Sequence, residues 1–146
     1  MFLLNADLLQ LVTSSSATID AEVYWSDNTT TTFTPSRTVT LISSAATTTI
    51  CAGPAASTQR VIKSIKIRNR HASTSNTIIV KHYDGVSTGE QISYALAAGE
   101  TLQYVDGGEY KVIDALGRFK TSGTASIADG SVTLANLADL AQDQFI

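Results

Sequence analysis

Cysteine, proline and charge are all scarce in this chain of 146 residues. The single cysteine, Cys51, excludes an intramolecular disulfide, and it lies in the apolar stretch TTTICAGP, where a buried and inert thiol is expected. Charged residues make up 16% and hydrophobic residues 43%, a balance typical of folded globular proteins and not of disordered ones. We therefore expect a folded chain whose cysteine usage is compatible with a reducing cytoplasm.

A basic excess and a targeting segment are also missing. The net charge of -3 at pH 7 argues against nucleic acid as the main partner, because phosphate binding usually shows as an excess of Lys and Arg. The stretch MFLLNADLLQLV lacks a basic region and is interrupted by Asn5, Asp7 and Gln10, so it resembles neither a signal peptide nor a membrane span. We expect neither nucleic acid nor a membrane as a partner.

Alternation of apolar and polar residues dominates most of the chain. In SATIDAEVYWSD, one face of a half-buried strand would carry Ala17, Ile19, Ala21, Val23 and Trp25. With LLQLV at residues 8–12, about nine strands are predicted, the others covering residues 38–43, 47–52, 61–69, 77–83, 91–96, 101–105 and 110–114. DNTTTTF, residues 27–33, is predicted to be a polar loop.

Short turns with glycine separate these strands. DG at Asp84–Gly85, DGG at Asp106–Gly108 and AAGE at Ala97–Glu100 supply the positive φ angles that tight hairpins need. No stretch before residue 125 has a helical apolar period over three turns, which argues against a parallel βαβ architecture. The predicted fold class is all-β, an antiparallel β-sandwich of jelly-roll or immunoglobulin-like type followed by a short C-terminal helical stem segment.

The last twenty residues, IADGSVTLANLADLAQDQFI, differ from the rest because their leucines are spaced by three. Ser131 or Thr133 can cap a helix, and one helical stripe would carry Leu134, Leu137, Ala138, Ala141 and Phe145. A helix this short is marginal alone in water, so it needs either other chains or the sandwich itself as a partner. The predicted division is a β-sandwich attachment domain at 1–119, a flexible linker at 120–126 and an oligomerising stem segment at 127–146.

One formal enzyme motif is present, GVSTG at Gly85–Gly89 with Ser87 at its centre. The G-x-S-x-G elbow needs a strand-to-helix turn and a histidine later in the chain, whereas here strands flank the motif and His71 and His82 both precede it. We interpret it as a hairpin loop. The two isolated histidines have no metal-ligand spacing, so we predict no catalytic residue, no metal and no cofactor.

The stretch RVIKSIKIRNRH, residues 60–71, holds five of the ten basic residues. On a strand, Lys66, Arg68 and Arg70 share one face, opposite Ile65 and Ile67. This face is a possible docking strand for an acidic protein surface. The alternative is a solvated face whose lysines discourage edge-to-edge aggregation.

Residues from about 55 onward contain an ordered series of core strands and turns, in STQRVIKSIKIRNRHASTSNTIIVKHYDG and ISYALAAGETLQYVDGGEYKVIDALGRFKTSG. The motifs in this series are, in order, RN-x-H, a small-residue loop, V-x-H-x-DG, LAAGE-x-L-x-Y-x-DG and K-V-x-D-x-x-G. The series resembles β-rich modules of tailed-bacteriophage virion proteins. The segment DGSVTLANLADL resembles the stems that follow such modules in tail and neck fibres and pack about a threefold axis.

The resemblance implies a non-enzymatic virion structural protein, made in the bacterial host cytoplasm, whose sandwich anchors a fibre to the particle. Its expected partners are itself, as a homotrimer joined by the stem stripe, and other virion proteins of the tail, neck or capsid. One alternative is a capsid decoration protein or a head-to-tail joining protein of the neck. Another is a glycan-binding β-sandwich, which would need exposed aromatic platforms because sugar rings stack on aromatic faces.

Overall fold

A computed structural model describes residues 1–120 of the chain as an all-β body with no helix in that range. No membrane-spanning helix is found among these residues. The strands are β1 (Phe2–Leu3), β2 (Leu8–Thr13), β3 (Ile19–Asn28), β4 (Phe33–Ile42), β5 (Thr47–Ala52), β6 (Gln59–Asn69), β7 (Asn76–Tyr83), β8 (Thr88–Leu96), β9 (Thr101–Val105), β10 (Lys111–Ile113) and β11 (Phe119–Lys120).

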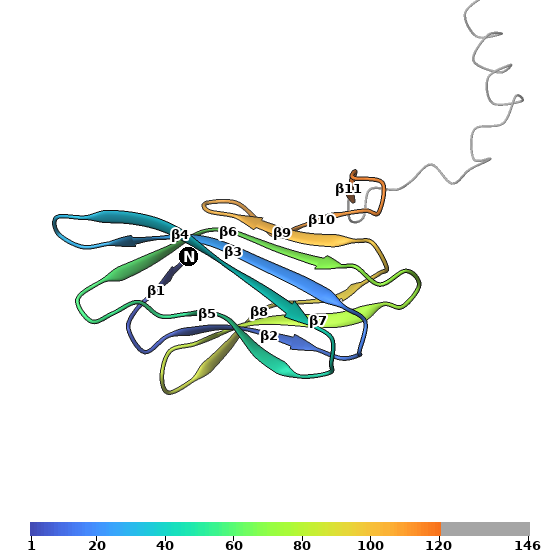
Figure 1. The fold of residues 1–146 in the computed structure, drawn as a ribbon, viewed down its shortest axis with the longest axis horizontal. Coiled ribbons are helices and arrows are strands. Elements are labelled where there is room, and N and C mark those ends of the chain that lie inside the picture. The colour runs from blue at the N-terminus through green and yellow to red at the C-terminus, as the bar shows by residue number, and fades with distance from the viewer. Residues whose placement is uncertain (121–146) are drawn as a thin grey trace, which may run out of the picture.

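Two antiparallel sheets make up this body. The seven-stranded sheet has the order β11-β10-β9-β6-β3-β4, with β1 paired to one end of β6, and the four-stranded sheet has the order β5-β2-β7-β8. Figure 1 shows the two sheets as two layers, with β3, β6 and β9 in one and β2, β5, β7 and β8 in the other. The predicted all-β, antiparallel class is confirmed.

The core lies between the two sheets and follows the alternation read from the sequence. Ile19, Ala21 and Val23 of β3 are fully buried, while Asp20 and Glu22 point to the opposite face. The other sheet contributes large buried side chains to the same cluster, among them Leu9, Leu11, Ile50, Ile78 and Val80. Burial of this apolar surface is the main force that holds the two layers together.

The strand between residues 33 and 42 is longer than predicted, and the prediction of a polar loop at residues 27–33 is wrong at both of its ends. Asp27 and Asn28 belong to β3, and Phe33 begins β4, because a tight turn closes with the Thr29 amide donating to the Thr32 carbonyl at 3.0 Å.

Pro35 is tolerated in β4 because the strand lies at the edge of its sheet. Backbone groups of β4 point alternately toward β3 and toward the free edge of the sheet. Because Thr32 is hydrogen-bonded to Thr29, the nitrogen of Pro35, three residues later, faces the free edge and removes no hydrogen bond between the strands.

The glycine turns take the backbone angles that their sequences predict. Gly85 and Gly107 have φ angles of 93° and 79°, in the region that glycine occupies without strain. Strands β1 and β11 are too short for any periodicity to reveal them. The body includes Lys120 in β11, one residue beyond the predicted boundary. The rest of the predicted linker and the stem segment at 127–146 lie outside the described residues, as does its stripe of Leu134, Leu137, Ala138, Ala141 and Phe145.

Candidate functional site

The outer face of the seven-stranded sheet holds the basic residues singled out in the sequence. Lys66 and Arg68 project outward from β6 and are exposed, because the residues that alternate with them, Ile65 and Ile67, are buried against the other sheet. Arg70 follows directly after the end of β6 and is also exposed. The structure therefore places these three cations along one side of the sheet.

Two of the three cations have acidic partners on the neighbouring strand. Lys66 Nζ lies 3.8 Å from Glu22 Oε1, and Arg70 Nε lies 3.3 Å from Asp20 Oδ2. Arg68 makes no ion pair within residues 1–120 and stands opposite Asp20 in the strand register. Of the predicted docking strand, Arg68 is thus the cation whose charge stays available to another molecule.

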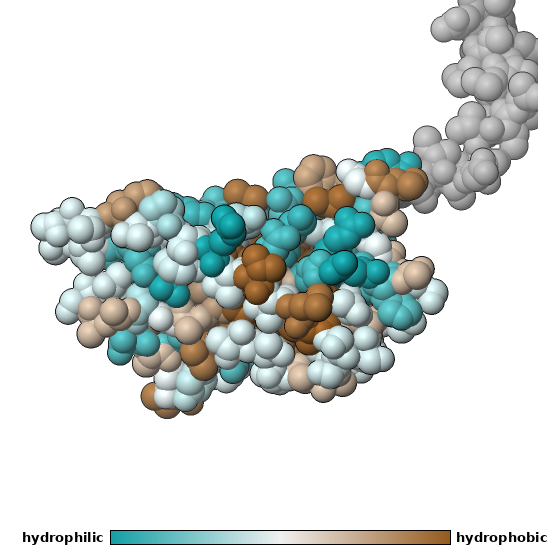
Figure 2. Space-filling model, viewed as in Figure 1, coloured by the Kyte–Doolittle hydropathy of each residue, from teal (hydrophilic) through white to brown (hydrophobic). Residues whose placement is uncertain are grey.

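Exposed nonpolar side chains lie beside these charges on the edge strand. Val39 and Leu41 of β4 are 63% and 61% exposed, and they stand opposite Glu22 and Asp20 in the register, so they project to the same outer face. We call these two residues the β4 stripe. Figure 2 shows hydrophobic side chains over β4 in the middle of the view, with hydrophilic side chains next to them.

Arg60, at the start of β6, has surroundings that the sequence did not reveal. Its guanidinium lies 3.4 Å from the centre of the Trp25 ring and donates to both Asp27 carboxylate oxygens, at 2.8 and 2.9 Å. It also donates to the Ala52 carbonyl of the other sheet at 2.8 Å, and its Nη1 lies 3.9 Å from the Cys51 sulfur. We call this the Arg60 cluster, and it ties the two sheets together.

A register shift explains why Arg60 points inward while Lys66 and Arg68 point outward. The pairing of β3 with β6 is interrupted between Tyr24 and Trp25, and Lys63 is the extra residue of β6 at that point. One extra residue moves every later side chain to the other face. The spacing of three between Ile62 and Ile65, where a regular strand would have two, is the signal in the sequence that could have located this bulge.

The serine and histidine candidates lie in turns and structural contacts. Ser87 sits in the hairpin between β7 and β8, where its amide donates to Asp84 Oδ1 at 2.7 Å, and antiparallel strands flank it, unlike the G-x-S-x-G elbow. His82 Nε2 lies 3.0 Å from Asp7 Oδ2, and His71 Nδ1 accepts the amides of Ser73 and Thr74. Residues 1–120 contain no group of three side chains that could hold a metal ion.

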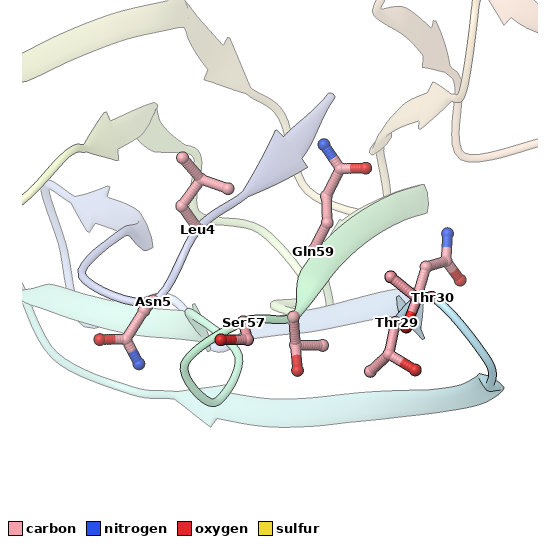
Figure 3. Close-up of a pocket in the computed structure, with 8 residues that line it drawn as sticks. Leu4, Asn5, Thr29, Thr30, Ser57 and Gln59 are labelled. Atoms are coloured by element: carbon pink, nitrogen blue, oxygen red, sulfur yellow. The ribbon is translucent and has the colours of Figure 1, made fainter.

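A hollow of about 530 Å³ opens at one end of the body, and sequence reasoning missed it. Three segments line it: Leu4 and Asn5 after β1, residues 28–30 at the turn between β3 and β4, and residues 57–59 at the start of β6. Figure 3 shows Leu4 and Gln59 projecting to the same side, with Ser57 between Asn5 and the Thr29–Thr30 turn. We call this the loop-end hollow.

No single site gathers the residues predicted from the sequence. Lys66, Arg68 and Arg70 share the outer face of one sheet, and the predicted stem residues lie beyond the described part of the chain. Comparison of the chain with models of protein families, with curated proteins and with solved structures found no match.

Proposed function

We propose that this chain is a non-enzymatic structural protein of a tailed-bacteriophage particle. In this proposal its two sheets form a β-sandwich that docks on another virion protein, and residues 127–146 begin a homotrimeric fibre stem. The resemblance of residues 55–146 to virion modules supports the class of protein. The outer face of the seven-stranded sheet supports the role of attachment.

The observation that carries the proposal is the β4 stripe beside Arg68. Val39 and Leu41 are largely exposed on the outer face of the seven-stranded sheet, where a contact with another protein would bury them. Arginine is enriched at protein interfaces, and Arg68 has no ion pair within residues 1–120 to give up on binding. The matching surface is an apolar patch with a carboxylate at its side.

Charge reversal at Arg68 tests the docking face. Arg68→Glu combined with Val39→Ser should leave the fold intact and abolish binding to purified particles that lack this protein. Arg68→Lys is the matched control, since it keeps the charge, and it should bind. If the double variant assembles as well as the unchanged chain, the outer face is a solvated surface and attachment lies elsewhere.

Solution mass tests the stem. Light scattering of residues 1–146 should give a trimer, and a chain that ends at Ser122 should give a monomer, which places the oligomer contacts in the leucine stripe. Two monomers would contradict an autonomous stem. They would favour a capsid decoration or neck-joining protein, whose last residues find their partner only on the assembled particle.

A further inference from the structure

We propose that the loop-end hollow is a binding site for a neutral saccharide. This inference does not depend on the proposed structural role, because it concerns a different part of the molecule. The hollow lies where three loops meet, whereas the β4 stripe and Arg68 lie on the sheet face. A volume of about 530 Å³ is within the range of small-molecule sites in proteins.

The residues that line the hollow carry no charge, and most of the surface that they present to it is nonpolar. Apart from Leu4, these residues also offer side-chain amides and hydroxyls, contributed by Asn5, Asn28, Gln59, Thr29, Thr30, Ser57 and Thr58. Each of these groups both donates and accepts hydrogen bonds, as sugar hydroxyls do. A phosphate, sulfate or sialic acid would find no cation among them, so the ligand class that fits is neutral.

One polar atom of a residue that lines the hollow has no hydrogen-bond partner within residues 1–120. This atom is Asn28 Oδ1, which is buried; the buried hydroxyl of Ser26, two residues earlier on the same face of β3 but not in the lining, also has no partner among these residues. Buried polar atoms in native proteins almost always have a partner. Asn28 Oδ1 has almost no accessible surface, so a ligand hydroxyl becomes its donor only when the Asn28 side chain rotates toward the hollow.

Apolar surface borders the amides on both sides. Phe33 stands opposite Asn28 in the register, and Asn28 stands opposite Gln59, so the three side chains project from one face in a row across β4, β3 and β6. Phe33 is 66% exposed, and Leu4, at the other side of the hollow, is 50% exposed. The C–H face of a sugar ring packs on such surfaces while its hydroxyls reach the amides.

The loops around the hollow are held in place by their own contacts. Ser57 has a φ of 60°, a conformation that residues other than glycine rarely adopt without a local reason. A Cβ at Gly53 would lie 2.2 Å from the Leu4 carbonyl oxygen, so the loop before β6 packs tightly on the loop after β1. The Asn5 amide also donates to the Pro54 carbonyl at 2.9 Å. A site built this way is largely formed before a ligand arrives.

Chemical-shift mapping tests the proposal. The full chain labelled with ¹⁵N is titrated at millimolar concentrations with neutral trisaccharides of gluco, galacto, manno and N-acetylglucosamine type. At least one should shift the backbone amides of Asn28, Thr30 and Gln59 in a saturable way, with a dissociation constant on the order of 1 mM. Polysialic acid and an uncharged Gly-Ser-Thr peptide capped at both ends are the comparison probes.

Substitutions in the hollow separate a specific site from weak general contact. Gln59→Ala and Thr30→Ala change exposed side chains and should each weaken sugar binding about tenfold. Gln103→Ala, an amide on the same sheet at β9, is the matched control and should leave binding unchanged. The proposal is overturned if no sugar shifts these amides, if the peptide or polysialic acid shifts them instead, or if the control weakens binding as much as the hollow variants do.

Discussion

The basic side chains at the two ends of β6 have different surroundings. In the first half, Arg60 points between the sheets, stacks on Trp25 and holds Asp27 with two hydrogen bonds. Lys66 in the second half, and Arg70 directly after the end of the strand, point outward and pair with Glu22 and Asp20 at longer distances. The side chain of Arg60 is only 12% exposed, whereas those of Lys66 and Arg70 are 47% and 55% exposed.

Burial decides what each of these pairs contributes. An exposed ion pair gains little, because water screens the charges and two long side chains lose freedom. When one member of a buried pair is removed, the other remains as an unpaired charge with little access to water. We therefore expect substitutions in the Arg60 cluster to destabilise the fold, and equivalent substitutions on the outer face to leave it nearly unchanged.

Removal of the Asp27 carboxylate should have the largest effect. Asp27→Ala leaves the Arg60 guanidinium without its bidentate partner, and we expect the free energy of unfolding to fall by about 3 kcal/mol. Urea denaturation followed by Trp25 fluorescence measures it. Asp20→Ala is the matched control, because it removes a carboxylate of the same strand whose partner, Arg70, is exposed. Equal losses in the two variants would contradict the comparison.

The thiol of Cys51 reports on the same cluster. Burial raises the pKa of Cys51, an effect that the neighbouring Arg60 only partly offsets. The folded state therefore holds the neutral thiol, and the unfolded state ionises first as the pH rises through the ordinary thiol range. At pH 8 we expect a thiol reagent to react about 100-fold more slowly with the folded protein than with the urea-unfolded chain.

Asp27→Ala should speed the labelling of Cys51, and Asp20→Ala should not. The reason is that Arg60 covers the sulfur at 3.9 Å while it is held by Asp27, and the exposed pair has no contact with the thiol. Rapid labelling of the unchanged protein would show that the cluster opens freely, which is incompatible with a structural role for it.

Arg60→Lys should have an intermediate effect. A lysine keeps the charge but cannot form two parallel hydrogen bonds with Asp27 or lie flat on the Trp25 ring. We expect a loss of about 1.5 kcal/mol in the free energy of unfolding, about half of the Asp27→Ala effect. Thermal and urea unfolding measure it. A lysine variant as stable as the unchanged protein would mean that charge alone, and not the planar geometry, stabilises this end of the body.

Much of the two-sheet body can be predicted from alternation, because each strand has one face on the core. The same rule fails at residue 63, where one extra residue reverses the faces and moves Arg60 inside. The loop-end hollow could not be predicted either. Its lining comes from three loops near residues 4, 29 and 58. Serine, threonine and asparagine are common in every loop, so only the fold shows which of them meet.

The smallest effect is expected for the pair of Glu22 and Lys66. A double-mutant cycle with Glu22→Gln and Lys66→Met should give a coupling of about 0.3 kcal/mol. The coupling is small because the charged atoms are 3.8 Å apart and the lysine side chain is nearly half exposed, so water screens the pair.

Raising the salt concentration should remove even this coupling, since exposed charges are screened within about 10 Å at moderate ionic strength. The Arg60 cluster should keep its contribution in the same salt. A coupling above about 1 kcal/mol between Glu22 and Lys66 would exceed what a screened surface pair contributes, and would mean that the outer ion pairs also stabilise the sheet. The outer face would then be part of the structural framework, and Arg68 alone would remain available to a partner.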